Sequence, residues 1–155
     1  MSILGTRVLR TEDPAFLTRG ARYVADLDDP RLDGAATVVF VRSQVAHGRI
    51  ESIDKGDAES MPGVVAVATA ADLAMDLLPA NRPAPNTMRQ PVLATDVVRF
   101  VGEPVVAVLA ETEAQAVDAA EQIWVDVEPF TPVVDVRQAA DDEVLLFPDA
   151  GTNVA

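Results

Sequence analysis

The chain contains no cysteine, and among its 155 residues it has a single histidine, His47, and a single lysine, Lys55. The absence of cysteine excludes disulfides, iron–sulfur ligation and a thiolate nucleophile within these residues. One imidazole without any thiolate also argues against a transition-metal site, because such sites need several nitrogen or sulfur ligands. Aromatic residues make up only 5%, so the core must be built largely from valine and alanine.

Basic residues are also scarce. Twelve lysines and arginines stand against 25 aspartates and glutamates, which gives a formal net charge of −13. Nucleic acid is therefore not expected as a partner, because phosphate backbones are bound through clustered basic side chains. The same sign argues against an anionic membrane surface. No apolar run reaches membrane-spanning length and the N-terminus lacks a signal-peptide core, so we expect no membrane insertion and a cytoplasmic location.

The composition, 49% hydrophobic and 24% charged, is typical of a globular protein. The length of 155 residues suits one domain. Its most informative stretch spans residues 97–129. Two apolar strands, at 97–101 and 105–110, are separated by Gly102-Glu103-Pro104. The unbroken apolar run of the second strand is typical of a strand covered on both faces.

A helix and a further strand complete this stretch. Thr112, followed three residues later by Gln115, has the form of a capping box and predicts a helix start. Small residues recur at helical spacing and let that helix lie close to a sheet; they are Ala116, Ala119 and Ala120, followed by Ile123. Alternation over 124–128 then predicts a strand that ends at Pro129.

The other elements are predicted from alternation, caps and breakers. They are strands at 36–42, 48–53 and 64–68, helical turns at 54–61 and 136–140, a helix at 70–77 capped by Thr69 and Asp72, and a loop at 79–91. The loop is long for a compact domain, and such loops often lie against a partner.

The chain divides into three segments on this pattern. Residues 1–34 are polar and turn-rich, and we expect an extended N-terminal arm that needs a partner surface. Residues 35–140 form the folded domain. Residues 141–155 carry neither a helix cap nor a charged tail, and we expect them to begin a linker to a missing region.

Candidate site residues each have a structural interpretation that we prefer. His47 lies four residues after Ser43 without a clear third group, so we read it as a turn or interface histidine. Arg42 and Arg49 flank this segment and could contact a small anion, but ordinary loop polarity explains them as well. Lys55 lies at a strand-to-helix step, which is not the hairpin position of a modified carrier lysine.

The strongest catalytic candidate is Glu103, a carboxylate held at a tight turn. No second acid or base lies nearby in the sequence, so we expect a structural corner. The acidic clusters at 12–13, 26–29 and 141–143 lack the ligand pattern of a calcium loop, and the eight glycines are scattered rather than gathered in a phosphate loop. We therefore predict no catalytic, cofactor-binding or metal-binding residue in this segment.

Several motifs nevertheless resemble one family in a fixed order. The opening run from Arg10 to Asp26 is similar to the start of the large subunit of molybdenum hydroxylases. Five further stretches follow in the family's order, at 41–54, 61–67, 98–105, 119–130 and 151–154. Among them, Val98-Arg-Phe-Val-Gly-Glu-Pro-Val105 is the most specific. The chain thus resembles the N-terminal α/β-hammerhead domain of the aldehyde oxidase, xanthine dehydrogenase and aerobic carbon monoxide dehydrogenase family, with carbon monoxide dehydrogenase-like large subunits nearest.

Two departures from the family pattern are small. Thr18-Arg19-Gly20 stands where the family often has Thr-Gly, and Val106 stands where it commonly has alanine. The resemblance implies an α+β hammerhead fold with a mixed sheet, two main helices and the N-terminal arm.

The resemblance also implies oxidative hydroxylation or carbon monoxide oxidation at a molybdenum–pterin centre. That cofactor would be held by the molybdenum-binding domains beyond this segment, and iron–sulfur clusters and FAD by partner subunits or domains. No catalytic residue of the family falls on this chain.

Three functions remain open at this point, and an independent small enzyme is the least favoured of them. The first is a structural domain that packs against the cofactor-binding domains of such a large subunit. The second is a free-standing acidic protein-interaction module without catalytic activity.

Overall fold

The computed structural model describes residue 5 and residues 10–20, 23, 26–73 and 86–154. The chain divides into two compact units, Met1–Gly34 and Ala35–Ala155, and each is described by itself. In the first unit, α1 (Asp13–Arg19) buries none of its residues, and a 3₁₀ turn follows at Pro30–Leu32. The expected extended arm is therefore partly helical. Pro14 in the first turn presets the helical backbone, and Asp13 and Arg19 suit the helix dipole.

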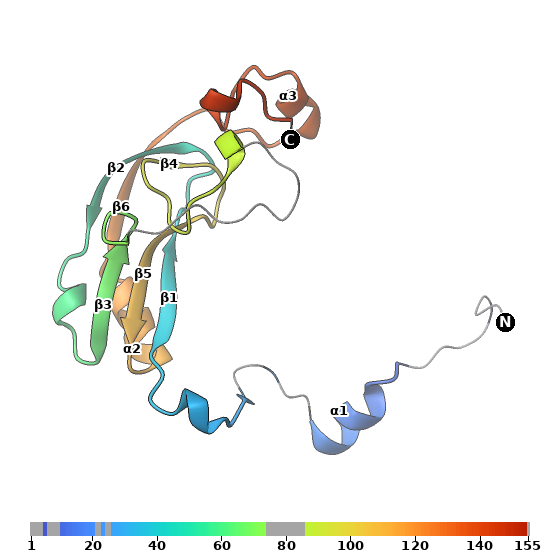
Figure 1. Ribbon diagram of the computed structural model, residues 1–155, viewed down its shortest axis with the longest axis vertical. Helices are drawn as coiled ribbons and strands as arrows, with labels where there is room; N and C mark the ends of the chain where they lie inside the picture. Colours follow the sequence, from blue (N-terminus) through green and yellow to red (C-terminus); the bar gives the residue numbers. More distant parts are fainter. Residues whose placement is uncertain (1–4, 6–9, 21–22, 24–25, 74–85, 155) are drawn as a thin grey trace. The chain divides into compact units, whose positions relative to one another are not determined.

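The core of the second unit is a three-stranded sheet with β5 (Pro104–Ala110) at its centre. The strands β1 (Thr37–Arg42) and β3 (Val64–Thr69) flank it, and both pair antiparallel to it. The three run side by side in Figure 1. The register sets Val106 opposite Val41. Both edges of β5 are hydrogen-bonded and most of its side chains are buried, so the predicted buried strand is confirmed.

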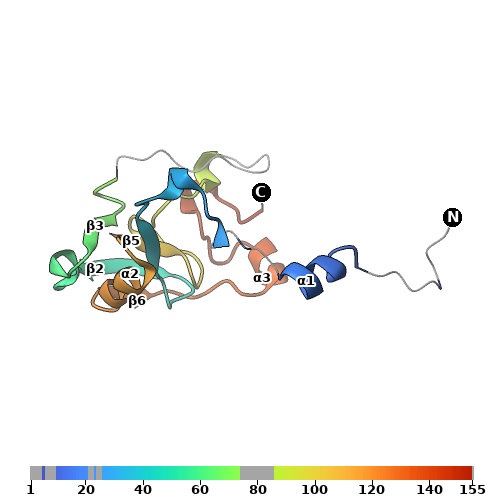
Figure 2. The same cartoon turned by 90° about the horizontal axis from the view of Figure 1, so that it is seen from below.

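Helix α2 (Glu113–Ala120) packs on this sheet. Figure 2, which looks up from the lower end of the sheet, shows the helix beside the strands. Its N-cap is Thr112, whose hydroxyl accepts the N–H of Gln115 at 3.3 Å, as the capping pattern predicts. Ala116 and Ala119 are fully buried. Because these side chains are small, the helix can approach the valine face of the sheet closely.

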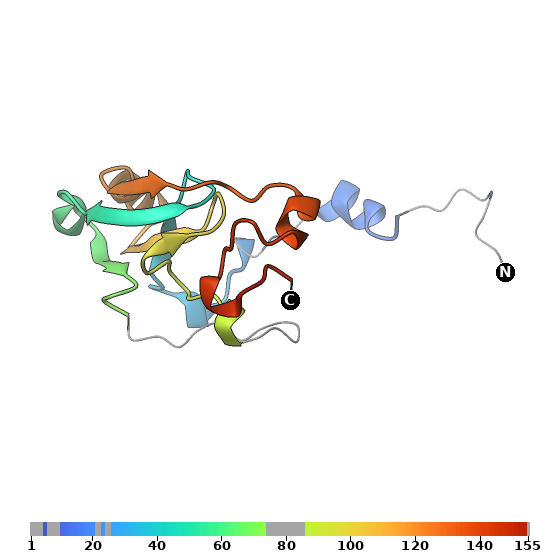
Figure 3. The same ribbon diagram turned by 90° about the horizontal axis from the view of Figure 1, so that it is seen from above.

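A second sheet has β2 (Gly48–Asp54) at its centre, between β4 (Val97–Val98) and β6 (Trp124–Pro129). Figure 3 shows β2 in turquoise beside β6 in orange. Both pairings are antiparallel. The expected α+β class is confirmed, but the expected mixed sheet is instead two antiparallel sheets over the described residues. Register shifts occur in β1, β2 and β3, and a bulge of this kind twists a strand and helps separate two sheets.

Within the second sheet, β2 and β6 approach each other closely at Gly48. A Cβ at this position would lie 2.5 Å from the carbonyl oxygen of Glu128 and 2.6 Å from a Val127 methyl group. Only glycine therefore fits where β2 meets β6 without moving backbone atoms.

Three predicted elements differ from the structure or lie outside it. The strand expected at 97–101 is only the two-residue β4, because the chain turns at Phe100–Glu103. Ala70–Asp72 form a turn rather than the start of a helix, and residues 74–77 lie outside the described residues. Of the loop at 79–91, residues 79–85 lie outside them too, and Asn86–Met88 form a 3₁₀ turn.

The remaining short elements lie outside the two sheets. A 3₁₀ turn at Ala58–Ser60 precedes β3. Beyond β6, α3 (Val136–Ala140) is capped by Asp135, whose carboxylate accepts two backbone N–H groups, and a last 3₁₀ turn spans Pro148–Ala150. The helical turn expected at 136–140 is confirmed.

Candidate functional site

The Gly102-Glu103-Pro104 corner is built by backbone contacts with the end of β1. Gly102 has φ +93°, a left-handed conformation that suits glycine. Its N–H donates to the carbonyl of Ser43 at 2.8 Å, and the N–H of Ser43 donates to the carbonyl of Glu103 at 2.9 Å. This pair of bonds fixes the corner against the strand end and turns the Glu103 side chain into the protein.

Glu103 is a buried carboxylate, with 3% of the residue exposed. One oxygen, Oε2, accepts the backbone N–H of Arg99. The other, Oε1, has no hydrogen-bond partner, and the Arg99 guanidinium lies 3.9 Å from it. Burial raises the pKa of Glu103, while the N–H and positive charge of Arg99 oppose that rise. A carboxylate this enclosed has no access to a substrate, which supports the structural interpretation.

Arg99, which the sequence analysis did not single out, links this corner to the C-terminal segment. Its Nε donates to the carbonyl of Leu146 at 3.1 Å, and another guanidinium N–H donates to the carbonyl of Val97 at 3.0 Å. The guanidinium also lies over the ring of Phe147, 4.7 Å from its centroid. The only signal in the sequence was its spacing of four residues from Glu103.

His47 is 6% exposed and lies against the start of the segment after β6. Its Nδ1 is 2.9 Å from the carbonyl oxygen of Thr131, and its ring meets that of Phe130 edge-on, with centroids 5.3 Å apart. Ser43 does not serve as a nucleophile for this imidazole. Its hydroxyl donates to the carbonyl of Val45 at 2.8 Å and accepts the N–H of the same residue.

Lys55 stabilises a turn through its ammonium group, which is not the arrangement of a covalently modified carrier lysine. Its ammonium donates to Glu59 at 2.9 Å, to the carbonyl of Val67 at 3.0 Å and to Asp72 at 3.2 Å. Hydrogen bonds from the N–H and hydroxyl of Thr69, with that from Lys55, lower the pKa of Asp72 to about 2. The ammonium is thus fully committed to local structure.

The two arginines considered for a small anion make separate contacts. Arg42 donates to the carbonyl of Gly102 at 2.8 Å and lies over the Phe40 ring. Arg49 lies over the ring of Phe130 instead. Their guanidinium groups therefore do not converge on one ligand.

The described residues offer no cluster of three or more His, Cys, Asp or Glu side chains with the geometry to hold a metal ion. They also include no helix that is long and apolar enough to cross a membrane. The chain also contains no cysteine, so it offers no thiolate ligand to a metal ion.

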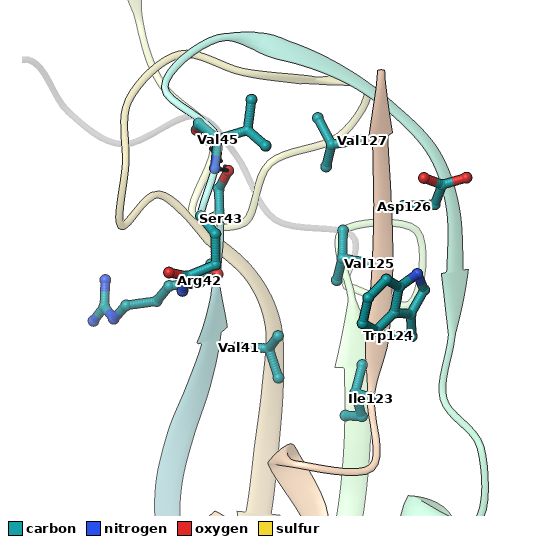
Figure 4. Close-up of a pocket in the computed structure, with 10 residues that line it drawn as sticks. Val41, Arg42, Ser43, Val45, Ile123, Trp124, Val125, Asp126 and Val127 are labelled. Atoms are coloured by element: carbon teal, nitrogen blue, oxygen red, sulfur yellow. Dashed lines mark hydrogen bonds between the residues drawn. The ribbon is translucent and has the colours of Figure 1, made fainter. Parts of the chain in front are cut away.

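An apolar groove of about 460 Å³, which we call the edge groove, is open to a partner. It lies between two free sheet edges, the end of β1 with the turn after it and strand β6. Figure 4 shows Val41 and Val45 on one side facing Val125 and Val127 on the other, while Asp126 points away. The indole of Trp124 stands at the rim, 72% exposed. Unpaired strand edges and apolar side chains together suit protein contact.

Comparison with known proteins gives a consistent result. The family model described as "Aldehyde oxidase and xanthine dehydrogenase, a/b hammerhead domain" matches residues 18–130. The nicotine 6-hydroxylase large subunit of Paenarthrobacter nicotinovorans is 41% identical over 142 residues, covering 89% of this chain and 17% of that protein. The carbon monoxide dehydrogenase large chain of Afipia carboxidovorans is 39% identical over 147 residues, covering 93% and 17%.

A solved structure agrees in fold as well as sequence. Quinoline 2-oxidoreductase from Pseudomonas putida 86 matches with a TM-score of 0.72 and 40% identity, over 94% of this chain and 19% of that one. This chain therefore spans less than a fifth of the length of each of these three proteins.

Proposed function

The chain belongs to the aldehyde oxidase and xanthine dehydrogenase family as its a/b hammerhead domain, and from this membership we propose a structural role in a larger enzyme. It packs against the cofactor-binding domains of a molybdenum–pterin-dependent oxidoreductase large subunit. The main support for the proposal is the difference in length between this chain and its relatives. Relatives about 40% identical over most of this chain are five to six times as long, and they are a large subunit and a large chain of their enzymes.

The surface of the second unit supports this role. The edge groove leaves partly buried valines, which pack against the core, open between two sheet edges, and the first sheet leaves Val38 and Phe40 exposed on its other face. A self-sufficient small domain would cover such surfaces, whereas a domain that packs on a neighbour leaves them for contact.

The activity, cofactors and partners of the whole protein are part of the same proposal. The remainder of the large subunit holds the molybdenum–pterin cofactor, and iron–sulfur and flavin groups reside on partner subunits or domains. The reaction class is oxidative hydroxylation or carbon monoxide oxidation. We further propose a cytoplasmic location, a folded domain over 35–140 and the start of a linker at 141–155. This chain's own part is to present a docking surface, with no catalytic residue of its own.

The test is co-purification from the native host with an affinity tag on this chain. We expect a longer molybdenum-binding polypeptide to co-purify, whether as a separate chain or as a continuation of the same one. Metal analysis of the purified material should then show molybdenum. If no molybdenum-binding polypeptide accompanies the tagged chain under any condition of growth, the proposal fails.

A second experiment tests whether the edge groove is the surface that contacts the longer polypeptide. Where the two parts are separate chains, Trp124→Ala should weaken their association roughly tenfold, because tryptophan is among the residues most enriched at interface hot spots. Glu128→Ala is the matched control, since Glu128 is exposed on the same strand and does not line the groove. Equal binding by the two variants would remove the edge groove from the interface.

The alternative of a free-standing acidic interaction module has no support in the family match or in the relatives. It predicts a tagged chain that purifies with other proteins but without molybdenum.

A further inference from the structure

A second hollow, of about 390 Å³, lies where β4, the segment after β6 and the C-terminal segment meet. We call it the histidine pocket. Its lining includes His47, Phe130 and Leu146, together with three charged residues, Asp96, Arg99 and Asp149. None of these residues has a role in the edge groove, so the two features are separate.

The buried imidazole determines what this pocket can bind. The Nδ1 of His47 faces the carbonyl oxygen of Thr131 at 2.9 Å. A carbonyl can only accept, so Nδ1 carries the hydrogen, and in the neutral ring Nε2 is then an acceptor. The described residues give Nε2 no hydrogen-bond partner, although 94% of the residue is buried. Among the described residues, Glu103 Oε1 is the side-chain atom that is buried without a partner, so Nε2 is instead open to the pocket, where it can accept a hydrogen bond from a ligand.

The charges around the pocket also favour a ligand group that donates hydrogen bonds and is positively charged. Asp96 and Asp149 are both exposed at its rim, and Asp149 has no ion-pair partner among the described residues. The one cation that lines the pocket, Arg99, is committed to the Leu146 and Val97 carbonyls and to the Phe147 ring. Arg49 lies over the ring of Phe130, a residue that lines the pocket. The free groups are therefore acceptors.

Other ligands fit less well. An anion would meet two carboxylates and the acceptor nitrogen of His47. A metal ion would need at least three ligands in reach, and no such group occurs among the described residues. A guanidinium or ammonium group, in contrast, donates several hydrogen bonds and carries the charge that the rim lacks.

We propose that the histidine pocket receives an arginine or lysine side chain from the molybdenum-binding part of the large subunit. The identity of the partner rests on the proposed function. The expectation of a positively charged ligand rests on the residues of the pocket alone. A basic contact surface on that partner also follows from charge complementarity, because this chain carries a formal charge of −13.

The first test uses the chain itself, in which His47 is the only imidazole. Nitrogen-15 NMR should show that the neutral ring carries its hydrogen on Nδ1. Titration with N-acetylarginine amide should shift the Nε2 resonance saturably. N-acetylglutamate at the same concentration and ionic strength should not. A saturable response to the glutamate probe, or no response to the arginine probe, would overturn the proposal.

A pair of matched variants tests whether the NMR response to the arginine probe arises in the histidine pocket. Asp149→Asn should weaken the arginine titration roughly two- to fivefold, as expected for an exposed ion pair. Glu51→Gln makes the same charge change at an exposed position of β2 outside the pocket and should leave it unchanged. Equal weakening by both variants would mean that only the net charge of the chain matters, and it would contradict a specific binding site in the pocket.

The second test uses the complex. The double variant His47→Phe with Asp149→Lys should reduce association with the longer polypeptide at least tenfold, while Glu51→Lys should not. If the longer polypeptide binds the double variant as well as wild type, the pocket assignment is wrong although the proposed function stands. If no longer polypeptide binds wild type, the proposed function fails and the NMR result still decides the pocket chemistry.

Discussion

Glu103 shows at the scale of one residue how the fold treats the two oxygens of a carboxylate unequally. Oε2 accepts the backbone N–H of Arg99, whereas Oε1 is buried without a hydrogen-bond partner. The net effect of burial is a raised pKa. In the folded chain the ionised form is therefore penalised relative to the unfolded chain.

This penalty predicts a pH-dependent difference between wild type and Glu103→Gln. Because the folded pKa lies above the unfolded value of about 4.5, the folded state binds the proton more tightly. The free energy of unfolding of wild type should then fall relative to the variant as pH rises from that value through the folded pKa. Urea unfolding of both proteins from about pH 4 to about pH 8 measures this difference. A constant difference would show that Glu103 titrates normally.

Residue roles were the hardest feature to predict from the sequence. The structural interpretation of Glu103 was reached because no partner acid or base lay near it in the chain. Arg99 and Thr131 were missed, since their contacts with Leu146 and His47 join segments 47 and 84 residues apart. Such pairs depend on how the strands pack, and no local pattern encodes them.

At the scale of elements, the start of α2 is held by one side chain. Thr112 accepts the N–H of Gln115, and the helix has only eight residues, so its first turn is a large part of it. Thr112→Ala should lower the free energy of unfolding by about 1 kcal/mol, measured by urea unfolding. Thr112→Ser keeps the hydroxyl and should retain most of the stability. A loss with serine as large as with alanine would contradict a capping role.

Single elements were predicted well and their pairing was not. The continuous apolar run of β5 and the alanine stripe of α2 are local signals, and the structure confirms both. The division into two antiparallel sheets was missed because strand alternation reveals which face is buried but not which neighbour a strand selects. The helix α1 was missed because its polar, proline-containing sequence is also typical of turns.

At the scale of the whole molecule, the two units should differ in their share of stability. Every residue of the described hydrophobic core lies between Ala58 and Ile123, and α1 buries none of its residues. A chain that begins at Ala35 should therefore unfold within about 0.5 kcal/mol of the full chain in urea, as changes away from the core do.

The same truncation should weaken co-purification with the longer polypeptide, because we expect the arm to lie on that partner. A truncated chain that is markedly less stable would instead assign the arm a place in this domain's own fold.

The position of Trp124 has an optical consequence. It is the only tryptophan in the chain, and its indole stands exposed at the rim of the edge groove. Intrinsic fluorescence excited in the tryptophan band therefore comes from a single fluorophore at the proposed contact. Covering the groove would move this indole from water into an apolar setting, so its emission should shift to shorter wavelength without any attached dye.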